Sequence, residues 1–491
     1  MINNMIFFQF IFIISMTLCS MAKQSKSPNI IFILTDDQGY GDMAVHGHPY
    51  LETPNMDRLH SESVRFDRFY VSPSCSPTRA ALMTGMHEFR NGVTHTVQPR
   101  EKLYKGALTI ADILKEGGYK TGFVGKWHLG NDKGYAPQYR GFDWYAKNAK
   151  GPHNHFDVEM IRNGKRFQTK GFREDAFFDE AMTFMKEAGE QPFFLYLCTY
   201  SPHTPLGAPE DLLKKYKAKG LNDNHAAYLA MIENIDDNLG RLDQFLKKEN
   251  LYDDTILIFM NDNGVTVGLD VYNADMRGPK CTIWEGGTRA FSLWRWPKKW
   301  QPKTVENLTA HLDVLPTLCE LAGVDVPEKV QGELEGYSLS PLLNGKDWEH
   351  NNRLLFHNVG RWPSGTAAAH KNAMCGIRKG NFLLVHSQGC EDPICEKYPS
   401  QCTTLRNVAK GFKHATYTKT NAQFHWGVSE GWQLYDVKKD PSNLNDLANA
   451  HPELVDELKQ AYSKWWDKQF PVMVKRGGDE GNPDANKRGK K

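Results

Sequence analysis

The chain has 491 residues, of which 40% are hydrophobic and 12% aromatic, so it can bury the core of a large α/β domain and of a smaller second domain. Its 60 Lys and Arg residues nearly balance its 58 Asp and Glu residues, which gives a formal net charge of +2 at pH 7. This balance excludes a protein that binds nucleic acid or a membrane surface through its overall charge.

Residues 1–22 resemble a secretory signal peptide. The apolar run from Met5 to Leu18 is too short for a comfortable membrane span. Small residues, Ser20 and Ala22, stand at positions -3 and -1 of a cut after Ala22. A lipoprotein signal ending at Cys19 is the alternative, which Leu18 disfavours. No later stretch approaches the ~20 apolar residues of a membrane helix, so we expect a periplasmic or secreted protein without a membrane span.

Four apolar strands are predicted, and each is followed by polar residues. Residues 29–34 form a continuous apolar run, typical of a central strand buried on both faces of a parallel sheet. The other three are predicted at 121–125, 193–199 and 255–260. The polar residues after the four strands are, in chain order, Asp36 and Asp37, Lys126 and His128, His203, and Asp262 and Asn263. Because sites in doubly wound folds form beyond the carboxyl ends of the strands, we expect one shared site.

Helical patterns alternate with these strands, and the character of the chain changes near Pro341. Further predicted elements are helices at 57–63, 109–116, 175–187 and 224–248, a strand at 64–71, short antiparallel strands near Phe356, at 381–386 and at 432–437, and an amphipathic helix at 452–467. We therefore expect a main α/β domain over residues 23–345 and an α+β subdomain over 346–474. Residues 475–491, rich in Gly, Pro and charge, are predicted to be a disordered tail.

The carboxylates at the strand ends predict a metal site. Asp36, Asp37, Asp262 and Asn263 offer only oxygen ligands, which Ca²⁺ and Mg²⁺ prefer. Three carboxylates crowded together without a cation would repel one another. An Asp-rich surface loop would explain either pair alone, but it does not explain why both pairs follow strands.

Cys75 begins a predicted helix. Pro77 suits the first helical turn, and the residues from Ala80 to Met83 favour a helix. The free backbone N–H groups of a helix N-terminus and the guanidinium of Arg79 both favour an anionic ligand. A buried structural cysteine before an ordinary helix is the alternative interpretation of the local pattern.

The remaining cysteines include candidates for a disulfide. Cys390, Cys395 and Cys402 cluster in a polar segment, where a disulfide is expected in an exported protein. A zinc site would need histidines at suitable spacing, and none is present there. The connectivity among these three and Cys375 stays open. Cys198 lies between apolar residues and is predicted to be free and buried.

The segment Cys75-Ser76-Pro77-Thr78-Arg79, with Thr84-Gly85 after it, resembles the signature of the type I sulfatases of the alkaline-phosphatase superfamily. The motifs Asp-Asp, Gly-Lys-Trp-His-Leu-Gly, Pro-His-Thr-Pro, Asp-Asn-Gly and Gly-x-Lys-x-x-x-Trp-Glu-Gly-Gly-x-Arg also resemble those of the family and follow its order. The resemblance implies an alkaline-phosphatase-like fold: a large mixed, mostly parallel sheet sandwiched by helices, with a smaller C-terminal α+β subdomain that carries a short antiparallel sheet. It also implies a sulfuric ester hydrolase, with the main domain catalytic.

The same resemblance implies two cofactor requirements. Cys75 would be oxidised to Cα-formylglycine by a formylglycine-generating or an anaerobic sulfatase-maturating enzyme. One Ca²⁺ ion would be held by Asp36, Asp37, residue 75 as formylglycine, Asp262 and Asn263. Asn261 stands before Asp262 where Ser is common in the family, but it is not an expected ligand.

Roles for the basic residues also follow from the resemblance. A hydroxyl of the formylglycine hydrate at position 75 would attack sulfur, with His203 as the general acid. Lys280 would contact the sulfate and its bridging oxygen, and Lys126 and Arg79 would stabilise charge. His128 would help deprotonate the second hydroxyl, which then expels sulfate and regenerates the aldehyde.

Candidate substrate-binding residues lie outside these motifs. His153, His155, Arg361 and Trp362 would suit a sulfated sugar, with a surface-loop position as the alternative for each. An exported, bacterial-looking sulfatase suggests a polysaccharide such as algal ulvan, carrageenan or fucoidan, or a host glycosaminoglycan. The sequence does not choose among these, or between attack at chain ends and internal attack. Alternatives are a phosphonate or phosphate monoester hydrolase of the same superfamily and a catalytically inactive carbohydrate-binding relative.

Overall fold

The computed structural model describes residues 27–151, 153–388, 416–419, 422–425 and 431–480. The predicted signal peptide lies outside the described residues, as do Cys390, Cys395 and Cys402. No helix in the described part of the chain is both long and apolar enough to cross a membrane.

A ten-stranded mixed sheet forms the centre of the molecule, in the order β12-β2-β11-β9-β1-β8-β4-β5-β6-β7. β1 pairs in parallel with β8 and β9, and β4 pairs in parallel with β8 and β5. The strands are β1 (Asn29–Asp36), β2 (Val64–Phe66), β4 (Lys120–Gly125), β5 (Trp144–Asn148), β6 (Glu159–Arg162), β7 (Lys165–Gln168), β8 (Phe193–Pro202), β9 (Thr255–Asn261), β11 (Ser292–Arg295) and β12 (Lys303–Val305). The parallel centre confirms the predicted α/β class.

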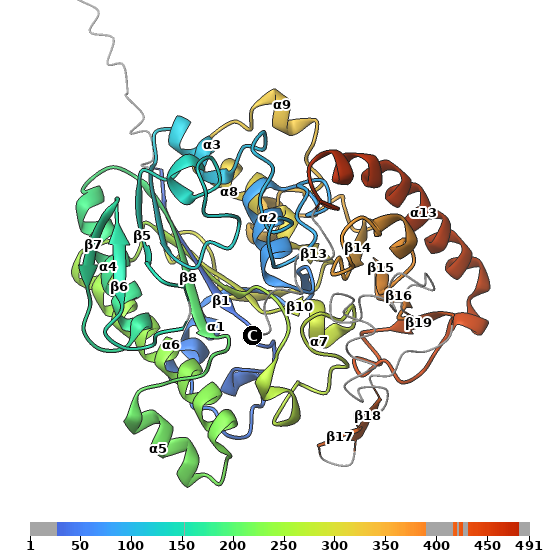
Figure 1. Ribbon diagram of the computed structural model, residues 1–491, viewed down its shortest axis with the longest axis horizontal. Helices are drawn as coiled ribbons and strands as arrows, with labels where there is room; N and C mark the ends of the chain where they lie inside the picture. The colour runs from blue at the N-terminus through green and yellow to red at the C-terminus, as the bar shows by residue number, and fades with distance from the viewer. Residues whose placement is uncertain (1–26, 152, 389–415, 420–421, 426–430, 481–491) are drawn as a thin grey trace, which may run out of the picture.

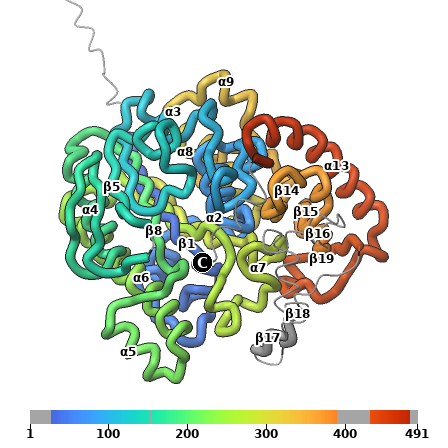
Figure 2. Tube along the Cα trace, in the orientation of Figure 1, coloured from blue at the N-terminus to red at the C-terminus, as the bar shows by residue number. Residues whose placement is uncertain are grey.

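Helices cover both faces of this sheet (Figure 1; Figure 2). Ile30 and Phe32 of β1 pack in a core with residues of α2, α3 and α8, whereas Ile31 and Ile33 pack with residues of α1, α4 and α6. The continuous apolar run of β1 is therefore buried on both sides, as predicted. The main helices are α1 (Pro54–Glu62), α2 (Cys75–Thr84), α3 (Ile110–Glu116), α4 (Arg173–Ala188), α5 (Glu210–Ala218), α6 (Asp223–Lys248) and α8 (Val314–Ala322).

The C-terminal part forms its own antiparallel sheet, which confirms the predicted fold class (Figure 1). Its strands are β14 (Leu354–Asn358), β15 (Cys375–Lys379), β16 (Phe382–His386) and β19 (Trp432–Asp436). Helix α13 (Pro452–Lys475) packs on this sheet through side chains such as Leu458 and Trp466. α13 is longer than predicted. Beyond it, Asp479 accepts a hydrogen bond from Trp362 Nε1 at 3.0 Å, so residues 475–480 are folded and not a disordered tail.

Smaller elements join the two parts. The predicted strand 64–71 is divided, because the chain leaves the central sheet at Asp67 and enters a three-stranded sheet. The strands of that sheet are β3 (Phe69–Tyr70), β10 (Arg289–Ala290) and β13 (Thr309–Ala310). Other short elements are α7 (Glu285–Thr288), α9 (Glu328–Gln331), α10 (Ser340–Leu343) and the hairpin of β17 (Thr416–Lys419) and β18 (Ala422–His425).

Cys198 is free and buried in β8, as predicted. Cys375, which was left open as a disulfide partner, is also free and buried, because β15 places it inside the C-terminal core.

Candidate active site

The carboxyl ends of the central parallel strands bring the predicted polar residues together. Asp36 is the last residue of β1, and Asp262 directly follows the neighbouring strand β9. Lys126 directly follows β4, and His203 directly follows β8. Cys75 is the first residue of α2, whose ten residues are all buried. The site is therefore built from four strand ends and one helix N-terminus.

Two aspartates and an asparagine are linked by hydrogen bonds at this edge. Asp37 has a φ of 67°, in the left-handed region that few non-glycine residues adopt. Its backbone N–H donates to Oδ1 of Asp262 at 3.2 Å, and Nδ2 of Asn263 donates to Oδ1 of Asp37 at 2.9 Å. Burial, together with the charge of Asp36, raises the pKa of Asp262 to about 6. Buried carboxylates at this spacing need positive charge nearby.

The oxygens of this cluster fit a hard cation. Oδ1 of Asp36 and Oδ1 of Asn263 are buried, and neither has a hydrogen-bond partner in the part of the chain that the structure describes. Asp36, Asp37, Cys75 and His203 can each offer a ligand atom, and these atoms lie within 4.8 Å of one another. Buried oxygens without partners beside carboxylates suit Ca²⁺ better than a soft transition metal.

Two lysines balance the aspartates. Nζ of Lys126 contacts Oδ2 of Asp36, and Nζ of Lys280 contacts Oδ1 of Asp37. Burial disfavours the charged forms of both lysines and by itself would lower their pKa values. Nevertheless Asp36 raises the pKa of Lys126, and Asp37 raises that of Lys280 well above its usual value. Both ammonium groups are therefore charged, and Lys280 Nζ also lies 3.0 Å from Cys75 Sγ.

Arg79 fixes the start of α2 against two strand ends. Its side chain is fully buried. Its Nε and one terminal nitrogen donate to Oδ2 of Asp262 at 3.2 and 2.8 Å, and its other terminal nitrogen donates to the backbone oxygen of Lys126 at 2.8 Å. A guanidinium can hold a carboxylate and a carbonyl in this planar geometry, which a lysine cannot.

The Cys75 thiol lies beside the acidic cluster and lines the cavity described below. Its Sγ is 3.9 Å from Oδ1 of Asp37. Burial raises the pKa of the thiol to about 12, so the sulfur is protonated at neutral pH and is a weak nucleophile.

Two histidines line the cavity beside Cys75. Nε2 of His128 lies 3.1 Å from the carbonyl oxygen of Thr96, which can only accept, so Nε2 carries the proton. Its Nδ1 is buried and finds no hydrogen-bond partner within the described ranges. Burial, with Lys126, lowers the pKa of His128 well below its usual value, which keeps the ring neutral. His203 directs Nδ1 to the Thr204 carbonyl and places Nε2 3.7 Å from Oδ2 of Asp37.

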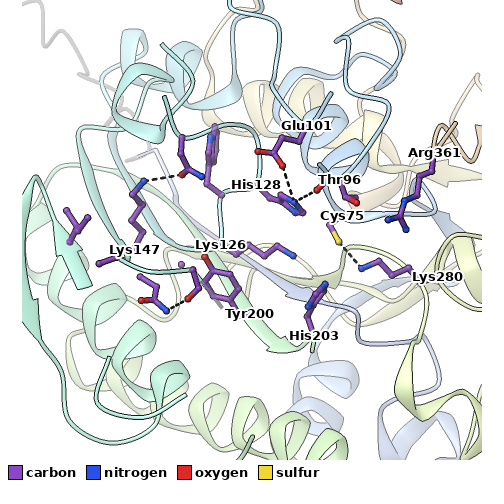
Figure 3. Close-up of a pocket in the computed structure, with 17 residues that line it drawn as sticks. Cys75, Thr96, Glu101, Lys126, His128, Lys147, Tyr200, His203, Lys280 and Arg361 are labelled. Carbon is purple, nitrogen blue, oxygen red and sulfur yellow. Dashed lines mark hydrogen bonds and ion pairs between the residues drawn. The ribbon is translucent and has the colours of Figure 1, made fainter. Parts of the chain in front are cut away.

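A cavity of about 660 Å³ opens over Cys75 (Figure 3). Its walls combine cations, aromatic rings and neutral polar groups. The lining residues are Cys75, Thr96, Glu101, Gly125, Lys126, Trp127, His128, Asn131, Lys147, Asn148, Ala149, Gly151, Ile161, Tyr200, His203, Lys280 and Arg361.

Of the two predicted substrate residues in the C-terminal part, only Arg361 lines this cavity. One terminal nitrogen of Arg361 lies 2.9 Å from Sγ of Cys281, next to Lys280. The prediction for Trp362 is wrong, because its side chain is only 1% exposed and packs against Phe89 in the core beneath α13.

The predicted substrate residues His153 and His155 are not among the lining residues. His153 is exposed. The ring of His155 is half-buried and stacks on Phe172 at a centroid distance of 6.2 Å. The structure therefore gives neither histidine a contact with the cavity.

Several lining residues were missed in the sequence. Tyr200 stands three residues before His203, so extending that motif backwards could have found it. Glu101, whose Oε2 is 3.7 Å from Nε2 of His128, lies in an irregular segment without a strand signal. Lys147 and Asn148 lie on β5, a short strand that the apolar pattern did not reveal.

The fold and the site place the chain in the alkaline-phosphatase superfamily, and comparison with known proteins identifies its branch. The family model described as Sulfatase matches residues 28–324, so the chain belongs to the sulfatase family and is a sulfatase of type I. A second model, N-sulphoglucosamine sulphohydrolase, C-terminal, matches residues 279–395.

Curated relatives and solved structures agree with this assignment. Arylsulfatase J of Mus musculus is 28% identical over 493 residues, which cover 94% of this chain and 79% of that protein. N-acetylgalactosamine-6-sulfatase of Homo sapiens is 32% identical over 361 residues, which cover 65% and 67%. The crystal structure of Ps i-CgsB has a TM-score of 0.75 at 27% identity and covers 92% of this chain and 94% of that chain. The complex of Ps i-CgsB with k-i-k-neocarrahexaose has a TM-score of 0.74 at 26% identity and covers 92% and 100%.

Proposed function

We propose that this sulfatase removes sulfate ester groups from a sulfated carbohydrate, with formylglycine at position 75 and one Ca²⁺ ion. The observation that carries the proposal is the position of Cys75 at the cavity. Its Sγ, which stands in for the oxygens of the hydrated aldehyde, is 3.0 Å from Lys280 Nζ and 3.9 Å from Asp37 Oδ1. A nucleophile there would meet an anionic ester surrounded by fixed positive charge.

Asp36, Asp37, Asp262, Asn263 and residue 75 would hold the ion. The hydrated aldehyde would supply a hydroxyl nucleophile, and the cation would supply positive charge that favours loss of its proton. The buried oxygens of Asp36 and Asn263 that have no hydrogen-bond partner support this ligand set.

The basic residues of the chain divide the charge and proton transfers among them. Lys126 and Lys280 line the cavity and supply positive charge for the sulfuryl oxygens that gain negative charge during the reaction, while the fully buried Arg79 acts behind them through Asp262. His203 lines the cavity and donates a proton from Nε2 to the leaving sugar oxygen. His128 would accept at Nδ1 the proton of the second hydroxyl at position 75, because this nitrogen is buried and has no hydrogen-bond partner among the described residues.

For the substrate, we propose a sulfated polysaccharide such as carrageenan or ulvan, or the oligosaccharides derived from it. The similarity to the Ps i-CgsB complex with neocarrahexaose supports the carrageenan class. The half-buried ring of Tyr200 in the cavity suits stacking on a sugar ring, and Arg361 suits an anionic substituent. Residues 23–345 would form the catalytic domain, with Arg361 contributed by the subdomain at 346–474.

We also propose that residues 1–22 direct export to the periplasm or beyond the cell, with a lipoprotein signal at Cys19 as the less favoured alternative. Before folding, the segment from Cys75 to Arg79 would be recognised by a formylglycine-generating or anaerobic sulfatase-maturating enzyme. After folding, Cys75 is buried, so modification has to precede closure of the site.

The test has two measurements. Mass spectrometry of the peptide that contains residue 75, from protein produced with the maturation enzyme, should reveal an aldehyde in place of the thiol. Release of sulfate from a panel of defined sulfated oligosaccharides, compared with hydrolysis of an aryl phosphate, should favour the sulfate esters. A fully unmodified thiol in active enzyme would refute the mechanism, and preferred phosphate hydrolysis would refute the proposed substrate class.

A further inference from the structure

The positive charges that line the cavity exceed what the aspartates neutralise. Lys126 and Lys280 each contact an aspartate of the acidic cluster. Lys147 and Arg361 also line the cavity, but among the described residues neither forms an ion pair with a carboxylate. The only carboxylate that lines the cavity, within the described part of the chain, is Glu101, which lies beside His128.

Lys147 stands apart from the residues that surround Cys75. Figure 3 shows it across the cavity from Arg361 and Lys280, with Lys126 and Tyr200 between them. Its position is fixed by the antiparallel pairing of β5 with β6, in which Lys147 is directly opposite Ile161. Both side chains therefore lie on the same face of the sheet, and both line the cavity.

The charge of Lys147 is poorly compensated in the protein itself. Among the described residues, its Nζ has one polar contact, with the neutral Oδ1 of Asn131 at 3.2 Å. Burial lowers the pKa of Lys147. A partly buried ammonium group without an anion costs free energy, and that cost is recovered when an anionic ligand binds.

We propose that Lys147 binds a second anionic group of the substrate, a sulfate or a carboxylate other than the ester that is hydrolysed. This inference rests on the proposed function of the cavity and narrows its substrate to saccharides with more than one acidic group. Asn131 adds a neutral amide beside Lys147 that suits a sugar hydroxyl, and Ile161 provides an apolar surface. Lys147 is thus a specificity-determining residue, separate from the groups that contact the scissile ester.

The test compares Lys147→Gln with Lys150→Gln, which removes the same charge from an exposed side chain three residues away. Inhibition of aryl sulfate hydrolysis is measured with matched pairs of saccharides. One pair is κ- and ι-neocarratetraose, of which the ι form carries the additional sulfates. The other is a monosulfated disaccharide with a glucuronate carboxylate and its neutral glucose counterpart. Each competitor is also titrated by calorimetry.

Wild-type protein and Lys150→Gln should prefer the more acidic member of at least one pair by about tenfold, as expected for a charge-assisted hydrogen bond. Lys147→Gln should lose this preference while its hydrolysis of the aryl monosulfate and its melting temperature stay unchanged. The pair that responds identifies the anion. The proposal is overturned if wild-type protein has no preference in either pair, or if Lys147→Gln keeps it. Failure to hydrolyse any sulfate ester would instead refute the proposed function, and calorimetry would still measure the role of Lys147.

Discussion

A buried ion pair connects the C-terminal sheet to the segment that carries Lys280, and breaking it should lower both stability and activity. Arg378 on β15 contacts Oε1 of Glu285 and donates to Oγ1 of Thr288 at 2.9 Å. Its guanidinium lies 3.7 Å from the ring centroid of Tyr70, and both charged side chains are 1% exposed. Removing one partner of such a pair costs roughly 3–5 kcal/mol, because the other charge stays buried.

Arg378→Met should therefore lower the thermal unfolding midpoint by several degrees. Because Glu285 begins α7 five residues after Lys280, aryl sulfate turnover should also fall by at least about tenfold, as expected when a catalytic group shifts by a fraction of an ångström. Scanning calorimetry at one fixed heating rate and initial rates at saturating substrate measure the two effects.

Arg166→Met is the matched control for this variant. It breaks another arginine–glutamate pair, with Glu159, in which the two side chains are 58% and 30% exposed. An exposed pair contributes about 0–1 kcal/mol, so this control should change neither midpoint nor turnover appreciably. In the double variant Glu285→Gln/Arg378→Met, the loss should be smaller than the sum of the single losses. If Arg378→Met behaves like Arg166→Met, the ion pair does not support the Lys280 segment.

Three further perturbations test the site and the fold. Cys75→Ala should reduce sulfate release by at least about a thousandfold, because it removes the nucleophile, while circular dichroism stays unchanged; retained turnover would exclude residue 75. Asp262→Asn should weaken Ca²⁺ binding by at least about tenfold, measured as a smaller rise in melting temperature on adding Ca²⁺; an undiminished rise would remove Asp262 from the ligand set. Although burial opposes it, the neighbouring His87 and His311 lower the pKa of Glu88 to about 2. The ionised Glu88 therefore contributes stability that is present above about pH 4.5, its unfolded pKa, and is lost as the pH falls towards 2. Glu88→Gln should flatten the acid limb of a stability–pH curve, and an unchanged limb would contradict this assignment.

The central strands and their polar ends could be predicted because they follow strong rules. β1 and β9 are apolar on both faces, so their runs are continuous and their ends are abrupt. β5, β6 and β7 escaped prediction because they lie at the sheet edge, where polar residues alternate with apolar ones and β7 is largely exposed. The division of the predicted strand 64–71 depends on pairing with β12 and β13, strands more than 200 residues away, which no local pattern reveals.

Site residues could be predicted where they lie in a recognisable motif, and an isolated residue could not be assigned in this way. Cys75 and Lys280 lie in motifs whose residue types are set by the chemistry of the site. These motifs can therefore be recognised in the sequence without knowledge of the fold. Trp362 looks like a sugar-stacking residue in the sequence, but an isolated tryptophan is equally suited to a core, and here it fills the space under α13. Only tertiary packing separates these two uses.

The sequence indicates the type of reaction more clearly than the identity of the sugar substrate, because the two depend on different parts of the fold. The groups around Cys75 follow β1, β4, β8 and β9, in the middle of the sheet, where parallel pairing fixes their positions. The walls farther from Cys75 come from the edge hairpin of β5 and β6, which carries Lys147, and from the C-terminal part, which supplies Arg361. An edge hairpin and a peripheral loop can change their side chains without disturbing the central strands. Substrate choice in this sulfatase should therefore depend on these two walls, and exchanging them should alter which saccharide is bound while the chemistry at residue 75 stays the same.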